Sequence, residues 1–340
     1  DLILGSHARG IWILDDLSPI QEWAKSENAD AYLFSSEGGT AMNMANDQMK
    51  GFEGDRLFLG LNPAPGATLA YRLKADAKDL KITIKDASGS TVRELSGDAT
   101  RDRNKAGLNI VKWDLRVQPL RPLPPPPGQA AGAPQGGGGG FGGGGNNGPY
   151  VLPGTYRATL NVNGRDAQTV DVTVKGDPLI NITDADRRIW HDTARDLHQL
   201  QEKANEVAEM VQNAFAQVQL IQQQTRNANL SANAKQQLDG IVKEFEAVRR
   251  RLGLGQQGGG GGFGGNTENL RGRLGQLKGQ VMASTARPTN TQMMQIREAR
   301  AALPGLIDQA NAVVAKVPGL VKDLIGNGAI FPAIKPVSKG

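Results

Sequence analysis

The chain has 340 residues, a formal net charge of +5 at pH 7 and no cysteine. This length allows two or three domains with their own cores. The lack of cysteine excludes disulfides, thiolate zinc sites and a cysteine nucleophile. Basic and acidic residues are interspersed, which is typical of a solvated surface and not of a nucleic-acid interface. No apolar run reaches the roughly 18 residues that span a bilayer.

The first nineteen residues contain two short apolar runs, residues 2–4 and 11–14, around a glycine-containing turn. Such a pair predicts a β-hairpin with both strands buried. Because an isolated hairpin is marginal in water, residues 1–19 are expected to complete another sheet. We therefore predict that Ile11, Trp12 and Ile13 are interface residues, covered by upstream chain or by a neighbouring molecule. The sequence begins at a strand without a leader, so we expect that a preceding segment has been removed or left out.

Between Arg56 and Lys175 apolar residues alternate with small or polar ones, which is typical of strands. The clearest runs are 69–73, 80–84, 108–115, 156–162 and 170–174. Asn163-Gly164, between the last two runs, is a strong signal for a two-residue hairpin loop. Six or seven short strands with glycine, proline and asparagine between them predict an antiparallel Ig-like β-sandwich at residues 51–177.

Two glycine-rich tracts interrupt these patterns. The first lies in a Pro/Gly-rich insertion at residues 117–149, and the second, at residues 253–265, repeats its run of five glycines, phenylalanine and two glycines. Such composition buries too little apolar surface to offset the entropy of ordering. Each tract carries one aromatic residue, so we predict that Phe141 and Phe263 anchor the tracts at an interface. Neither tract is a phosphate-binding loop, because no Lys-Ser/Thr follows it.

After Pro178 the apolar period lengthens to about three and a half residues, which indicates amphipathic helices. Four apolar stripes follow one another, at 190–221, 238–252, 270–281 and 293–317. Thr183 followed by Asp186 is typical of a capped helix start. Four such faces joined by short or glycine-rich links predict an antiparallel helical bundle at residues 178–326, with residues 327–340 as a C-terminal tail.

Residues that could carry catalysis or hold a metal are few. Asp15 and Asp16 are adjacent on a strand, so their side chains face opposite sides and cannot act as a carboxylate pair. His191 and His198 lie two helical turns apart, about 10 Å along the axis, which is too far to share an ion. We interpret them as part of a solvated helix face. The sequence predicts no catalytic residue, no metal site and no cofactor.

Several segments resemble a known family. The run from His7 through Ile11-Trp12-Ile13-Leu14-Asp15-Asp16-Leu17-Ser18-Pro19 resembles the closing strands of bacterial sortilin-like β-propellers, often labelled glycosyl-hydrolase, BNR-repeat or exo-sialidase-like. Gly60-Leu61-Asn62-Pro63 resembles the entry to the sandwich that follows the propeller there. Trp113-Asp114-Leu115-Arg116 and Pro153-Gly154-Thr155-Tyr156 resemble its later strands and those of flagellar hook-cap Ig-like domains. Ala8, where glycine is expected, and the glycine tracts depart from the family.

The resemblance implies a multidomain β plus α fold: closing propeller-blade strands and a connector at residues 1–50, then the sandwich and the bundle. It implies a non-catalytic docking or assembly region of a secreted, periplasmic or cell-surface protein, with an upstream propeller or neighbouring subunits as protein partners. The alternative is the accessory C-terminal part of a glycoside hydrolase whose catalytic propeller lies upstream; the chain itself contains no sialidase-type Asp-box. A third interpretation is an isolated helix-bundle module that binds a partner.

Overall fold

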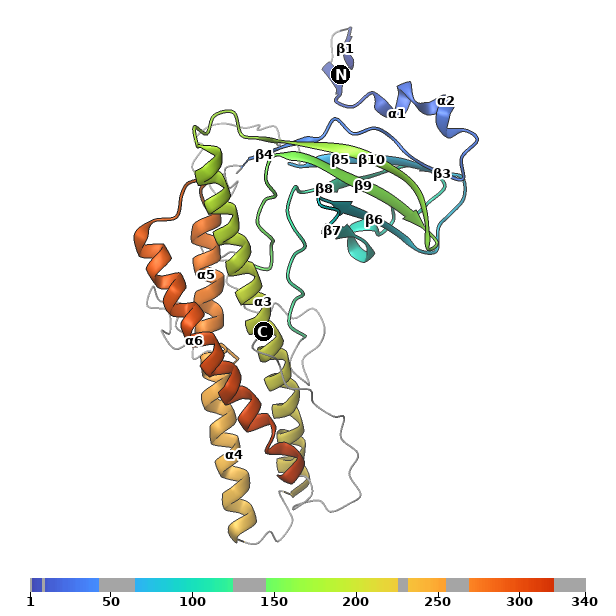
Figure 1. The fold of residues 1–340 in the computed structure, drawn as a ribbon. Helices are drawn as coiled ribbons and strands as arrows, with labels where there is room; N and C mark the ends of the chain where they lie inside the picture. The colour runs from blue at the N-terminus through green and yellow to red at the C-terminus, as the bar shows by residue number, and fades with distance from the viewer. Residues whose placement is uncertain are drawn as a thin grey trace. The chain divides into compact units, whose positions relative to one another are not determined.

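The structure is a computed structural model that describes residues 2–7, 10–42, 65–124, 145–225, 232–254 and 269–320. The chain divides into two compact units. The first comprises residues 1–119 and 147–191 and contains the strands; the second comprises residues 120–146 and 192–340 and contains most of the helical residues (Figure 1). The predicted multidomain β plus α class is confirmed. None of the described helices is long and apolar enough to cross a membrane.

The first unit opens with the predicted hairpin. Strands β1 (Leu2–Ser6) and β2 (Gly10–Leu14) pair antiparallel, with Leu2 opposite Leu14 and Ser6 opposite Gly10. Among the described strands these two pair only with each other. Two short helices follow, α1 (Ser18–Gln21) and α2 (Trp23–Ser26).

Two larger sheets form the rest of this unit. The five-stranded sheet has the order β4 (Gly39–Ala41), β10 (Arg165–Gly176), β9 (Gly154–Val162), β6 (Leu80–Lys85) and β7 (Thr91–Leu95). The three-stranded sheet has the order β3 (Ala31–Leu33), β5 (Ala67–Leu73) and β8 (Gly107–Trp113). All neighbours pair antiparallel except β4 and β10, which pair parallel. The predicted loop at Asn163-Gly164 joins β9 to β10, and both residues have positive φ, as a type I′ turn requires.

The two sheets share one core, in which Trp113 is central. Its side chain is fully buried, and its ring meets the Tyr156 ring of the other sheet edge-to-face, with centroids 5.3 Å apart. The indole N–H donates to the Arg116 carbonyl at 3.0 Å. Along β8, Val111 is buried with Trp113, whereas Ile110 points to solvent. Val111, two residues before Trp113, therefore lies on the inner face of β8, and Ile110 lies on the outer face.

The two sheets begin earlier in the chain than the sequence boundary at residue 51. Strand β3 pairs with β5, and β4 pairs with β10, so residues 31–41 belong to these sheets and not to a separate connector. The approach of β4 needs a glycine, because a Cβ atom at Gly38 would lie 2.0 Å from the Thr173 carbonyl oxygen. Strands of three residues are too short for alternation to show in a sequence, which explains the difference.

The second unit packs four helices, α3 (Asp184–Thr225, which begins in the first unit), α4 (Ala232–Arg251), α5 (Leu270–Met282) and α6 (Asn290–Val314). The predicted cap of α3 is present, since the Asp186 N–H donates to Thr183 Oγ1 at 3.1 Å. The apolar stripes meet in a buried core, where the Phe215 and Phe245 rings lie 5.7 Å apart. Ion pairs join the helices outside this core, as between Arg273 of α5 and Glu298 of α6.

Helices α4 and α5 meet end to end. Helix α4 closes with Gly253 at positive φ, and the Leu254 N–H donates back to the Arg249 carbonyl at 2.8 Å, which is a Schellman closure. Arg271, in the first turn of α5, donates to the Leu252 carbonyl at 2.7 Å. The N-cap of α5 is Asn269, whose side chain accepts from Gly272. The two helices therefore form one column with a joint at residues 252–254 and 269–272 (Figure 1).

Candidate interface hairpin

The pairing of β1 with β2 decides which side chains share a face. Partners directly opposite each other lie on the same side of a two-stranded sheet. One face therefore carries Leu2, Leu4, Trp12 and Leu14, and the other carries Ile3, Ile11 and Ile13. Both faces of this hairpin are apolar.

These seven side chains are all exposed. Ile11, Trp12 and Ile13 are 73%, 70% and 60% exposed. The predicted hairpin is thus present, but the burial expected for its strands is not found within the described residues. A single soluble protein rarely exposes so many neighbouring large apolar side chains, and such patches usually mark interaction sites.

The two edges of the hairpin add a second means of association. Neither β1 nor β2 pairs with a further strand among the described residues, so each presents a row of backbone N–H and C=O groups. Such edges are templates for pairing with another strand. The hairpin can therefore join another sheet by backbone hydrogen bonds while burying apolar side chains on both sides.

The other two predicted interface residues, Phe141 and Phe263, lie outside the described residues, and their roles stay predictions. The ends of the first insertion are described and are ordered by contacts that the sequence did not predict. In the first unit the Val117 N–H donates to the Pro149 carbonyl at 3.0 Å, and the Arg116 guanidinium lies 3.7 Å from the centre of the Tyr150 ring.

The acidic residues and histidines considered from the sequence lie on different elements. Asp15 and Asp16 follow β2 and are not on a strand as expected, because β2 ends at Leu14, and His191 and His198 lie on α3. The Asp16 carboxylate accepts from the Ser18 N–H at 2.9 Å, at the start of α1. No group of three or more potential metal ligands occurs among the described residues. The interpretation of His191 and His198 as a solvated face is wrong, because these side chains are only 7% and 8% exposed.

A buried lysine of α5 lies against His198. Lys278 Nζ lies 3.3 Å from His198 Nδ1, and Lys278 is fully buried. The sequence contained a signal for this burial, since Lys278 follows Leu274 by four residues and so lies on the apolar face of α5. Sequence analysis followed only the apolar residues of that stripe and missed the lysine.

Comparisons of the chain with protein-family models, with curated proteins and with solved structures found no match.

Proposed function

We propose that this chain is a non-catalytic docking or assembly region of a secreted bacterial sortilin-like propeller protein. In this proposal hairpin β1–β2 supplies the closing strands of a propeller blade. The observation that carries the proposal is that the hairpin is apolar and exposed on both faces. The blades of a propeller are stacked around a central channel, so strands inside a blade are covered on both sides.

The two apolar faces favour this arrangement over simple self-association. Two hairpins that met through one face would leave the other face exposed to water. Insertion into a blade covers both faces and at least one edge. Full burial of an exposed large apolar side chain contributes about 1.5–3 kcal/mol. The seven side chains are between 42% and 73% exposed, so covering what remains exposed contributes roughly 6–12 kcal/mol before the costs of ordering.

We further propose that the two-sheet unit is an Ig-like sandwich that connects the propeller to the helices. Two features support this detail. The Tyr156 hydroxyl donates to the Leu152 carbonyl at 2.8 Å, close to the start of β9, which is the geometry of a tyrosine corner. The short strand β4 pairs parallel with β10, the final strand. The strand before β4 in the chain, β3, pairs with β5 in the other sheet. The first strand of the sandwich is therefore divided between both sheets.

The first test is the size of the native polypeptide that carries this sequence. The proposal expects a mass above about 90 kDa, since a propeller adds several hundred residues. In that protein the amide hydrogens of Ile11, Trp12 and Ile13 should exchange slowly, whereas in the isolated 340-residue chain they should exchange as exposed amides. A native subunit of 36.1 kDa with the same fast exchange contradicts the proposal.

A second test changes the hairpin itself. Replacing Ile11, Trp12 and Ile13 with serine should raise the solubility of the isolated chain and reduce any association seen by light scattering. The matched control is Ile20→Ser, because Ile20 is also exposed, at 62%, but lies outside the hairpin. Equal effects of the triple and the control variants would show that the hairpin is no association site.

A further inference from the structure

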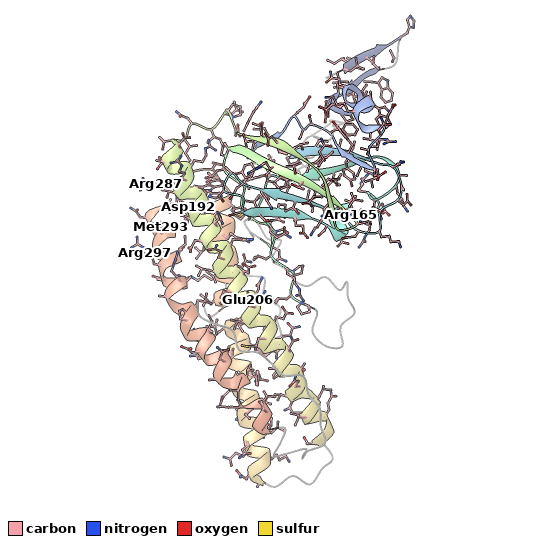
Figure 2. The ribbon with its side chains drawn as sticks, turned by 45° about the vertical axis from the view of Figure 1, so that its right-hand side comes forward. Arg165, Asp192, Glu206, Arg287, Met293 and Arg297 are labelled. Carbon is pink, nitrogen blue, oxygen red and sulfur yellow. The ribbon has the colours of Figure 1, made fainter. Side chains whose placement is uncertain are left out.

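A row of polar residues runs along the middle of α3. His198, Gln201, Asn205, Glu209 and Gln212 recur at intervals of three or four residues, so they lie on one face of the helix. Glu206, labelled in Figure 2, marks this stretch of α3. His198, Gln201 and Gln212 are each less than 10% exposed. Buried polar side chains of this kind require hydrogen-bond partners.

The partners come from the insertion between β8 and β9. We call residues 120–146 the strap; they belong to the second unit, and the structure describes residues 120–124 and 145–146 of them. Gln212 Nε2 donates to the Pro124 carbonyl at 2.9 Å, and Gln201 Nε2 donates to the Gly145 carbonyl at 3.3 Å. The two ends of the strap also bind each other, since the Leu120 N–H donates to the Asn146 carbonyl at 2.7 Å.

Lys278 holds the same carbonyl from a second helix. Its Nζ donates to the Gly145 carbonyl at 3.0 Å and also lies against His198. The Gly145 oxygen thus receives hydrogen bonds from α3 and from α5. A buried ammonium group is costly unless hydrogen bonds satisfy it, so this contact couples the strap to the packing of the two helices.

The hydrogen bonds from Gln201, Gln212 and Lys278 all end on backbone carbonyls of the strap, and none of them ends on a strap side chain. Proline has no N–H and can offer only its carbonyl, so a proline-containing chain needs donors on the surface that binds it. The amide groups of Gln201 and Gln212 and the ammonium group of Lys278 are such donors.

The same face also offers acceptors. Gln201 Oε1 and Asn205 Oδ1 are buried and have no hydrogen-bond partner among the described residues. Glycine, unlike proline, keeps a backbone N–H that can donate to such oxygens. The face therefore offers both donors and acceptors to a peptide backbone.

We propose that this face of α3, together with Lys278, is a binding site for the backbone of a peptide that contains proline and glycine, and that the two described ends of the chain's own strap, residues 120–124 and 145–146, occupy it. The site recognises main-chain groups, so it tolerates changes of strap side chains. The strap is therefore a ligand that belongs to the same chain as the helices that bind it. The described part of the strap also makes one exposed ion pair through a side chain, between Arg121 and Glu209, 3.3 Å apart, and such a pair contributes little.

The test measures hydrogen exchange of the Leu120 amide in the full chain, because this amide is bonded only when the strap ends are closed. In Lys278→Met the protection of this amide should fall about tenfold or more, as expected for the loss of a charged donor. The matched control is Lys243→Met, since Lys243 lies exposed on α4. Pro124→Ala, which keeps its carbonyl, should change the protection less than threefold.

A gentler variant keeps the proposal testable if Lys278→Met also loosens the helices. Gln212→Ala removes one donor and leaves the buried lysine intact. It should lower the protection of the Leu120 amide several-fold while amides in the centre of α5 keep theirs. The proposal is wrong if the Leu120 amide is as well protected in Lys278→Met and in Gln212→Ala as it is in the Lys243→Met control. A larger effect of Pro124→Ala than of Gln212→Ala would overturn the main-chain mode of recognition.

Discussion

The core of the two-sheet unit makes a quantitative prediction at Trp113. Trp113→Ala removes a fully buried indole, its edge-to-face contact with Tyr156 and the donor that satisfies the Arg116 carbonyl. Truncation of a buried tryptophan costs about 3–5 kcal/mol. The aromatic pair contributes about 0.5–1.5 kcal/mol, and the hydrogen bond from the indole to the partly buried Arg116 carbonyl contributes about 0.5–1.5 kcal/mol. We therefore expect a loss in the upper part of the 3–5 kcal/mol range, since these effects overlap and do not add fully.

Hydrogen exchange of the β5 and β8 amides is the appropriate assay, because it reports the two-sheet unit separately from the helices. The matched control is Trp12→Ala, the same substitution at a residue that is 70% exposed. The control should change the free energy of unfolding by less than about 0.5 kcal/mol. If the two variants agree within that margin, Trp113 is not central to the core and the reasoning is wrong.

Three further predictions concern the tracts, a backbone approach and pH. Phe141→Ser with Phe263→Ser should weaken any assembly of the native protein, measured by light scattering, without unfolding either unit; equal assembly in the double variant contradicts the predicted anchoring. Gly66→Ala should destabilise the two-sheet unit by several kcal/mol, because Gly66 has φ +132° and a Cβ atom would lie 2.2 Å from a carbonyl oxygen at the end of β8. Gly305→Ala, in α6 where nothing lies within 4 Å, should instead be neutral or stabilising in thermal melts. Burial raises the pKa of Tyr71, whose hydroxyl donates to the Arg103 carbonyl at 2.6 Å. The folded state therefore holds this proton more tightly than the unfolded state, so stability should fall as the pH rises above about 10, the usual pKa of tyrosine. Tyr71→Phe should remove this alkaline loss in urea titrations at pH 9–11, and an unchanged pH dependence would refute the assignment.

The spacing of apolar residues and the residue types at turns predicted the longer helices and strands well. The alternation at 80–84 became β6, the loop at Asn163-Gly164 became the turn between β9 and β10, and Thr183 caps α3 as expected. These signals are local, since each depends on neighbours within four residues. The hairpin at residues 2–14 was also predicted from local pattern.

The missed features depend on contacts between distant residues. Strands β3 and β4 are too short to show a period and are defined by their pairing with β5 and β10. The burial of Lys278 depends on a carbonyl 133 positions earlier in the chain. The end-to-end contact of α4 with α5 joins residues that lie on either side of a glycine tract in the sequence. From composition alone, that tract indicated only a break between two separate helices.

The joint between α4 and α5 has a consequence for how the chain can vary in length. Because Leu254 and Asn269 flank the same joint, the segment between them begins and ends at nearly the same point of the column. Closing such a loop costs only about 0.6 kcal/mol more for each doubling of its length. Insertion or deletion of residues in this segment should therefore have little effect on the packing of the helices. The joint is also a natural place to insert a reporter or to open new chain ends.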